Sequence, residues 1–256
     1  MSPEIVMENM TWEEIRDAIR SGSTNVAFAV ASWEQHGPQL PISTDTLLGD
    51  EIARRVASKL AKTLVGPTIR PGYSPHHMTF PGTITLRGET LEMLIEDYCI
   101  SLAKHGFKNI VVICSHGGNT PTMKLACRKA AGSVVGVNVI PIYDIVPYAP
   151  EGTFDRESGF HANRAETSLI LYIREGLVKK DKIQKDPMRL NKNIIDYSIL
   201  LAQGFVSDIS STGVLGDPTG ASSQEGEKIL EVIVENMTKE IRLLLGADDS
   251  LGISAG

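Results

Sequence analysis

Two short apolar runs constrain the fold of this chain more than any other feature. They cover residues 25–31 (NVAFAVA) and residues 109–114 (NIVVIC). Neither run alternates apolar with polar residues, as a half-exposed strand would, and neither is long enough for a buried helix. Short uninterrupted apolar runs are typical of strands that are covered on both faces, as in parallel sheets flanked by helices. The runs therefore predict two central strands of a parallel sheet.

Segments with helical spacing of apolar residues alternate with these strands. A helix is expected to begin at Thr11, where Thr11 and Glu14 have the form of a capping box. Further helices are expected over 44–60, 89–104, 119–131, 164–175 and 221–245, a weaker strand over 63–69 and another buried strand over 137–143. Residues 71–85 are expected to form a long functional loop, 179–192 to be irregular and 247–256 to be frayed. We therefore predict an α/β fold with a single domain over residues 1–256, built on a layered, mostly parallel sheet with helices on both faces.

Composition and charge limit the functions that this chain can have. The formal net charge is -6, and acidic and basic residues are interspersed without a basic stripe. This pattern argues against nucleic acid and against an anionic membrane surface as partners. The start of the chain lacks the apolar run of a signal peptide, and we find no membrane-length apolar segment. The three cysteines, Cys99, Cys114 and Cys127, match no metal or disulfide pattern, so a cytoplasmic protein with reduced, buried thiols is expected.

Polar side chains with metal-binding chemistry follow both apolar runs. Glu34 and His36 come after the first run, and His116 comes after the second. The carboxyl ends of parallel strands meet at one edge of a sheet, so these side chains are expected to converge if the two strands are neighbours. Asp45 begins the following helix, where the helix dipole favours a carboxylate. A mixed set of Glu, His and Asp suits zinc, manganese or iron(II) better than calcium or magnesium.

Each of these residues also has a simpler interpretation when it is taken alone. A single histidine is more often structural than a ligand, and Asp45 alone would be a helix N-cap. The segment from His116 to Asn119 alone would be a turn or an anion-binding nest. A third segment carries His161 and Glu166, where Glu166 alone would be a solvent-facing glutamate of a first helical turn. The prediction of a metal site depends on the combination of imidazoles and carboxylates at two strand ends.

The motif-bearing segments together resemble the creatininase family. The matching stretches, which span most of the chain, are SWEQHGPQLPISTDT (32–46), SPHHMTFPGTITL (74–86), SHGGNT (115–120), HANRAETS (161–168) and GVLGDPTGAS (213–222). The resemblance implies a single α/β domain, a homohexamer and a centre of two divalent metal ions (zinc, manganese or iron). It implies one ion on Glu34 and His116, the other on His36 and Glu166, and Asp45 as the bridge between them.

The resemblance also implies roles for residues around the metal centre. His161 corresponds to the catalytic histidine of the family, and Glu166 is assigned with it to catalysis. The alternative for His161 is a residue that only orients a neighbouring carboxylate. His77 is expected to contact the substrate, and Phe80 is expected to form a wall of the pocket. Gly117 and Gly118 are expected to let backbone N–H groups approach the substrate oxygen. His76 is assigned no function.

Departures from true creatininases bear on the substrate. Those enzymes carry a Tyr-Glu pair where this chain has Gly117 and Gly118, and they place tryptophans around the substrate in the second half of the chain. Here the tryptophans are Trp12 and Trp33, which argues against creatinine as the natural substrate. The HGGN form is similar to relatives that act as formamide deformylases, as mycofactocin-precursor peptidases or as hydrolases in inositol breakdown.

The sequence therefore predicts a metal-dependent amidohydrolase that cleaves a C–N bond of a small substrate, such as a cyclic amide or a formamide. Two alternatives keep the metal centre: ring opening of a carbonyl compound, and trimming of a terminal peptide residue. A third alternative is a metal-binding protein without turnover. The carboxylate-rich ligand set argues against this third alternative, because structural zinc sites are usually closed by four cysteine or histidine ligands.

Overall fold

The centre of the molecule is a four-stranded parallel sheet with the strand order β2-β1-β3-β4. The computed structural model describes residues 3–154, 158–186 and 204–246. The strands are β1 (Asn25–Val30), β2 (Thr63–Val65), β3 (Asn109–Cys114) and β4 (Asn138–Ile142). A separate antiparallel pair is formed by β5 (Gly159–His161) and β6 (Leu215–Gly216). The predicted α/β fold with a parallel sheet is confirmed.

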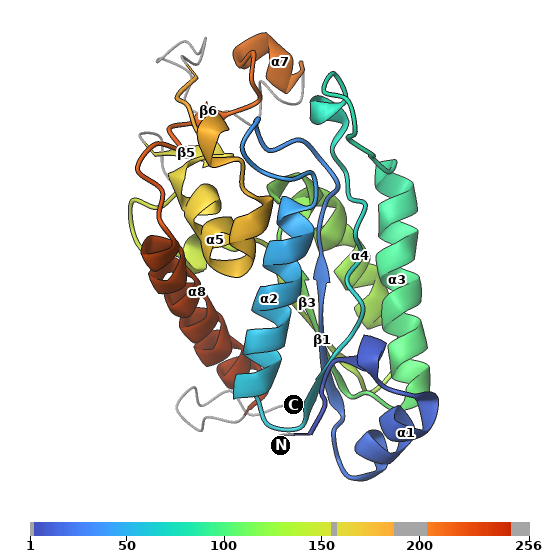
Figure 1. Cartoon of the computed structure of the whole chain (residues 1–256). Coiled ribbons are helices and arrows are strands. Elements are labelled where there is room, and N and C mark those ends of the chain that lie inside the picture. The colour runs from blue at the N-terminus through green and yellow to red at the C-terminus, as the bar shows by residue number, and fades with distance from the viewer. Residues whose placement is uncertain (1–2, 155–157, 187–203, 247–256) are drawn as a thin grey trace.

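Helices cover both faces of the sheet and explain why the central strands are apolar throughout. One layer consists of α2 (Thr44–Lys59), α5 (Arg164–Arg174) and α8 (Ser223–Leu244), and the other of α1 (Trp12–Arg20), α3 (Gly88–His105) and α4 (Thr120–Ser133) (Figure 1). Successive side chains of a strand point to opposite faces. In β1, Ala27 therefore packs in the core on the α2 side, and Phe28 packs in the core on the α3 side.

Some elements differ from the sequence prediction. The strand expected over 63–69 ends at Val65, because Pro67 has no N–H with which to continue the ladder. Ile69 returns to β1 only through a single bridge with Val30. The loop at 71–85 contains a 3-10 turn at Pro75–His77. The strands β5 and β6 and the short helix α7 (Val206–Ile209) were not predicted, because each is too short to show periodicity.

The remaining short elements are 3-10 turns in the connections. They are η1 (Met7–Asn9), η3 (Gly117–Asn119), η4 (Val146–Tyr148), η5 (Glu175–Leu177) and η6 (Lys180–Lys182). The last of these lies in the stretch expected to be irregular, whose residues 187–192 are outside the described part of the chain. The expected fraying of residues 247–256 also falls outside it.

Three asparagines connect the amino ends of the strands. Asn25 is in register with Asn109, and Asn109 is in register with Asn138. The side-chain amide of Asn138 donates to the Asn109 side chain at 2.8 Å, and the Asn109 amide donates to Asn25 at 2.8 Å. Asn25 in turn donates to the carbonyl oxygen of Ala61 at 3.1 Å. This asparagine ladder satisfies three neutral amides and favours one register of three neighbouring strands.

The cysteines and the helices agree with two of the compositional expectations. Cys99, Cys114 and Cys127 are free and buried, and burial raises the pKa of each thiol to about 12. These thiols behave as small apolar groups rather than as nucleophiles. Within the described residues, no helix combines the length and apolar character needed to span a bilayer.

Candidate metal centre

The carboxyl ends of β1 and β3 bring the predicted metal ligands together. The two strands are neighbours and pair in parallel from Asn25 to Val30, so the segments that follow them lie side by side. These segments place Glu34, His36 and His116 at one edge of the sheet. Asp45 lies in the first turn of α2, and Glu166 lies in the first turn of α5. All five side chains are buried, with exposed fractions from 0% to 8%.

Carboxylates and imidazoles alternate in this buried cluster. His36 Nε2 lies 3.1 Å from Asp45 Oδ1 and 3.9 Å from Glu166 Oε1. On the other side, His116 Nε2 lies 3.2 Å from Glu34 Oε2, and His116 Nδ1 lies 3.5 Å from Asp45 Oδ2. Asp45 is therefore the shared member, with one carboxylate oxygen toward each histidine.

Three overlapping groups of side chains have ligand atoms close enough together to hold a metal ion. One consists of Glu34, Asp45 and His116, and another of His36, Asp45 and Glu166. These two groups share Asp45 and correspond to the two predicted ligand sets. The third group consists of Glu34, His36 and His161, so His161 is also within reach of an ion. The ligand atoms within each group lie within 4.8 Å of one another.

Two carboxylate oxygens of the cluster lack hydrogen-bond partners and are therefore suited to binding a cation. Glu34 Oε1 and Asp45 Oδ2 are buried and make no hydrogen bond within the described protein. Burying a carboxylate oxygen without a partner is costly, and a cation that binds it removes the cost. With its oxygen and nitrogen donors and no thiolate, the set suits zinc, manganese or iron(II).

Mutual attraction and burial move the pKa values of these groups apart. Burial alone lowers the pKa of His36, but Asp45, Glu166 and Glu34 together raise it to about 10. His116 behaves similarly, with burial opposed by Glu34 and Asp45, and its pKa rises to about 9. Burial raises the pKa of Glu166 to about 7. In the metal-free protein at neutral pH, His36 and His116 therefore carry protons that a metal ion must displace.

A second pair of histidines, His77 and His161, lies against the same carboxylate. His77 Nε2 is 3.4 Å from Glu34 Oε1, and His161 Nδ1 is 3.8 Å from the same oxygen. Burial lowers the pKa of His77 to about 3 and holds the pKa of His161 well below its usual value. Both rings are therefore neutral at pH 7, and each has one N–H donor and one lone pair.

A cavity of about 720 Å³ opens onto the cluster. The predicted ligands Glu34, His36, Asp45, His116 and Glu166 line it, together with the predicted catalytic and substrate-binding residues His161, His77, Gly117 and Gly118. Phe80, expected as a wall of the pocket, is half-buried and lies outside this lining. The lining does include His76, for which no role was predicted. Trp12 and Trp33 are not part of it.

The two glycines that line the cavity differ in what a side chain at each position would do. A Cβ at Gly118 would lie 2.3 Å from His116 Nε2 and 2.7 Å from the Tyr73 carbonyl oxygen, so a side chain there would displace His116. A Cβ at Gly117 would meet nothing within 4 Å. Gly118 is therefore required for the packing of a candidate ligand, whereas Gly117 leaves space beside the site.

Several side chains that support the site were not singled out from the sequence. Ser32 Oγ donates to Glu34 Oε2 at 3.0 Å and also contacts Ser74 Oγ, which lies 3.2 Å from His116 Nε2. Asn163 caps α5 by accepting from Glu166 N at 3.0 Å, and the Ala162 N–H donates to the Glu166 carboxylate. Ser32 and Asn163 lie within the motif segments, and their types are those of common capping and hydrogen-bonding residues, which is why the pattern does not separate them.

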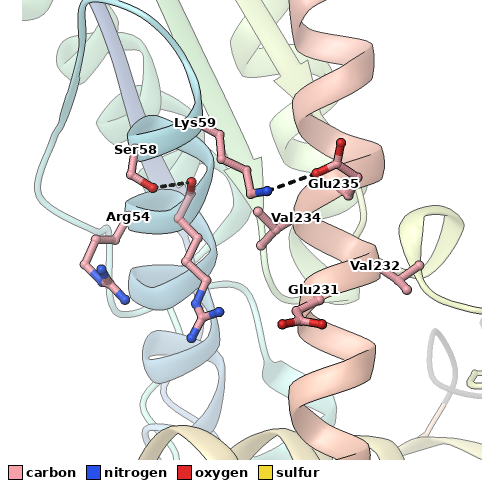
Figure 2. Close-up of a pocket in the computed structure, with 8 residues that line it drawn as sticks. Arg54, Ser58, Lys59, Glu231, Val232, Val234 and Glu235 are labelled. Carbon is pink, nitrogen blue, oxygen red and sulfur yellow. Dashed lines mark hydrogen bonds and ion pairs between the residues drawn. The ribbon is translucent and has the colours of Figure 1, made fainter.

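Another cavity, of about 610 Å³, lies between the C-terminal half of α2 and α8 and is remote from the motif residues (Figure 2). Its basic side chains are matched by carboxylates. Arg54 and Arg55 each contact Glu51, at 2.7 Å and 2.6 Å, and Lys59 contacts Glu235 at 3.0 Å. We therefore assign the chemistry to the cluster at the sheet edge.

Comparison with known proteins agrees with the geometry. The creatininase (creatinine amidohydrolase) family model matches residues 8–241. A mycofactocin precursor peptide peptidase of Mycobacterium tuberculosis is 29% identical over 245 residues, which cover 90% of each chain. A creatinine amidohydrolase of Pseudomonas putida is 28% identical, covering 94% of this chain and 98% of the relative.

Solved structures resemble the whole chain as well. A manganese creatininase superposes with a TM-score of 0.80 at 25% identity, and a creatininase variant of the Zn-Zn type with a TM-score of 0.77 at 26% identity. In both cases the match covers 94% of this chain and 98% of the other.

Proposed function

The chain belongs to the creatininase family, and from this premise we propose that it is an amidohydrolase whose two divalent metal ions activate water to cleave a C–N bond of a small amide. The observation that carries the proposal is the sharing of Asp45 between two groups of potential ligands. One carboxylate with an oxygen toward each group is the arrangement that a pair of adjacent ions requires. The orphaned oxygens of Glu34 and Asp45 support it, because both need a cation.

The residues divide into ligands and groups that handle the substrate. Glu34 and His116 would hold one ion and His36 and Glu166 the other, with Asp45 available to both. Bound divalent ions supply Lewis acidity, which lowers the pKa of water toward ~7 and polarises an amide carbonyl. His77 and Gly117 line the cavity, where they would contact a bound substrate. The lysine, arginine and histidine side chains near the surface are assigned no role in binding the ions or the substrate.

We assign proton transfer to His161. The leaving nitrogen of an amide needs a proton, and an imidazole that lines the cavity can accept one proton and donate it again. His161 Nδ1 faces Glu34 Oε1 at 3.8 Å, beside the proposed ions. A metal-ligand role for His161 is the competing assignment, because His161 belongs to one of the three ligand groups.

The substrate assignment favours a small amide other than creatinine. Neither tryptophan lines the cavity, and Gly117 leaves open space where true creatininases carry a tyrosine. A cyclic amide or a formamide fits this description. A second candidate is the terminal amide bond of a short peptide. It is favoured by the cavity volume of about 720 Å³, by Phe160 and Phe205 in the lining, and by the name of the mycobacterial relatives.

The decisive experiment combines metal content with turnover. Metal per chain is measured for the wild type and for Glu34→Gln, and both are assayed against formamides, lactams, creatinine and short peptides. We expect two ions and hydrolysis of one substrate class in the wild type, with turnover lost in Glu34→Gln. Absence of bound metal after remetallation, or activity untouched by Glu34→Gln, would refute the proposal.

The substitution His161→Asn distinguishes proton transfer by His161 from metal binding by His161. With proton transfer, the variant keeps two ions per chain and loses turnover. Loss of one ion on the same substitution would instead make His161 a ligand. The homohexamer and the cytoplasmic location implied by the sequence remain proposals, which sedimentation and cell fractionation would test.

A further inference from the structure

A glutamine inside the first motif contacts both histidines that face Glu34. Gln35 follows Glu34 directly and is 5% exposed. Its side-chain Nε2 lies 2.8 Å from His77 Nδ1, and its backbone oxygen lies 2.8 Å from His161 Nε2. One residue therefore reaches two rings that come from distant parts of the chain.

The orientation of the Gln35 amide is determined by its surroundings. The backbone N–H of Gly37 can only donate, and it lies 2.8 Å from Gln35 Oε1. The opposite end of the amide must then be the NH₂ group. Its two hydrogens face three possible acceptors: His77 Nδ1 at 2.8 Å, His161 Nε2 at 3.0 Å and the carbonyl oxygen of Gly213 at 3.2 Å.

The same contacts determine where each ring carries its proton. His77 Nδ1 accepts from the Gln35 amide, so the proton of neutral His77 is on Nε2, the nitrogen that faces Glu34 Oε1. His161 Nε2 lies closer to the backbone oxygen of Gln35, at 2.8 Å, than to the Gln35 amide nitrogen, at 3.0 Å, and the oxygen can only accept. We take the shorter contact as the hydrogen bond, so Nε2 donates and, in the neutral ring, the lone pair of His161 is on Nδ1. The two histidines thus present opposite groups to the same carboxylate oxygen: an N–H from His77 and a lone pair from His161.

The loop behind Gln35 is built for this contact. A Cβ at Gly213 would lie 1.9 Å from Gln35 Oε1, and its φ of +86° also favours glycine. Gly213 N donates to Ser210 Oγ at 2.9 Å, and Ser210 Oγ donates to the buried Asp186 at 2.7 Å. Asp186 also accepts from Thr212 N at 2.9 Å. This chain of hydrogen bonds holds the Gly213 carbonyl against the amide.

We propose that Gln35 is a positioning residue that makes His77 a hydrogen-bond donor and His161 a proton acceptor at the reacting centre. The role of the two rings in turnover rests on the proposed function, whereas their proton positions do not. Gln35 acts through the rings and touches neither ion nor substrate in this assignment. Its side chain orients the donor, and its backbone orients the acceptor.

The test is to observe the ring protons directly. Long-range ¹H–¹⁵N spectra of the imidazoles are recorded for the metal-free and the zinc-loaded wild type, with His77→Asn and His161→Asn to assign the signals. We expect a neutral ring with its proton on Nε2 for both histidines. A proton on Nδ1 of either wild-type ring would overturn the proposal.

The substitution Gln35→Glu replaces the NH₂ group that donates to His77 with an oxygen that only accepts, and it changes the shape of the side chain very little. A carboxylate only accepts hydrogen bonds, so His77 is expected to gain a proton on Nδ1, and kcat is expected to fall by about 100-fold while zinc content stays at the wild-type value. An unchanged His77 signal in this variant would overturn the proposal. Gln39→Glu is the matched control: Gln39 is equally buried, but its amide donates to the Ala162 carbonyl at 2.9 Å, so the His77 signal is expected to stay unchanged.

The spectra also separate this proposal from the proposed function. Wild-type rings protonated on Nε2 in a protein that hydrolyses no amide would refute the hydrolase and still support the placement of the protons by Gln35. An active enzyme with a proton on His77 Nδ1 would support the hydrolase and refute the placement of the protons by Gln35.

Discussion

The two ends of the central sheet differ in how their polar groups are satisfied. At the amino end, Asn25, Asn109 and Asn138 form a ladder of neutral amides in which each donor has an acceptor. At the carboxyl end, three buried carboxylates meet four imidazoles, and Glu34 Oε1 and Asp45 Oδ2 are without hydrogen-bond partners in the described protein. The same strands run from one end of the sheet to the other.

The amino end of the sheet is therefore a stabilising end, and the carboxyl end, which carries the candidate site, is the functional end. Satisfied neutral amides contribute modestly to stability and favour one register. Buried carboxylates with orphaned oxygens reduce stability unless a cation binds them. A fold retains such a cluster where it performs chemistry, and parallel sheets offer that place at the carboxyl ends of their strands.

Asp45→Asn should break the functional end most severely. The amide has one acceptor oxygen instead of two, and it cannot bridge two cations as a carboxylate does. We expect more than ~100-fold loss of kcat, because even partners of direct ligands typically contribute that much, together with a fall from two ions per chain to one or none. Turnover with hydrolysable substrate and metal analysis provide the measurements. Retention of two ions at full activity would contradict the bridging role.

Metal affinity should depend steeply on pH at this end. His36 and His116, with pKa values of about 10 and about 9, are protonated in the metal-free protein at neutral pH. A metal ion needs neutral imidazoles, so binding releases protons, and each proton released makes affinity rise about tenfold per pH unit below these values. We expect a gain of about 10-fold to 100-fold per unit between pH 6.5 and 8.5. Competition with a chelator measures it, and an affinity independent of pH would disagree with the assigned protons.

Zinc should stabilise the fold because it satisfies the orphaned carboxylate oxygens. Free zinc at about 100 times its dissociation constant adds about 2.7 kcal/mol to the free energy of unfolding. For a chain of this length, that corresponds to a rise in Tm of about 5–10 °C. Differential scanning calorimetry with and without a chelator measures the shift. Asp45→Asn is the control, in which the shift should shrink or disappear.

Asn109→Ala should have the smallest effect and should leave function intact. It removes the middle amide of the ladder, and the cost of one partly exposed hydrogen-bonding group is about 1 kcal/mol, or a fall in Tm of about 2–4 °C. Because the other end of the sheet keeps its geometry, kcat and metal content are expected to equal those of the wild type. A large loss of turnover in this variant would mean that the two ends are coupled.

Much of the candidate metal centre could be predicted because its potential ligands are concentrated in motif segments after predicted strands. Glu34, His36, Asp45 and His116 needed only the rule that parallel strands end at one edge, together with the neighbouring positions of β1 and β3. Glu166 and His161 were assigned through the family resemblance, because their plain local patterns have simpler interpretations. The structure places all six side chains in the lining of one cavity.

Other features depend on contacts between segments that are distant in the sequence. Gln35 shows this most clearly, because its partners His77, His161 and Gly213 are separated from it by 42, 126 and 178 positions. Phe80 was predicted to form a wall of the pocket, and the folded loop leaves it outside the lining. Its position follows from how the loop at 71–85 folds, which residue types alone do not specify.

The sequence by itself determined the alternation of strands and helices, the burial of both central strands and the identity of the candidate metal ligands. These follow from local periodicity and from the polarity of residues at strand ends. Only the tertiary structure decided which oxygens remain without partners, which groups face the nitrogens of His77 and His161 and which side chains line the cavity. Hydrogen bonding and desolvation act between atoms a few ångströms apart, and the fold, rather than the order of the residues, brings those atoms together.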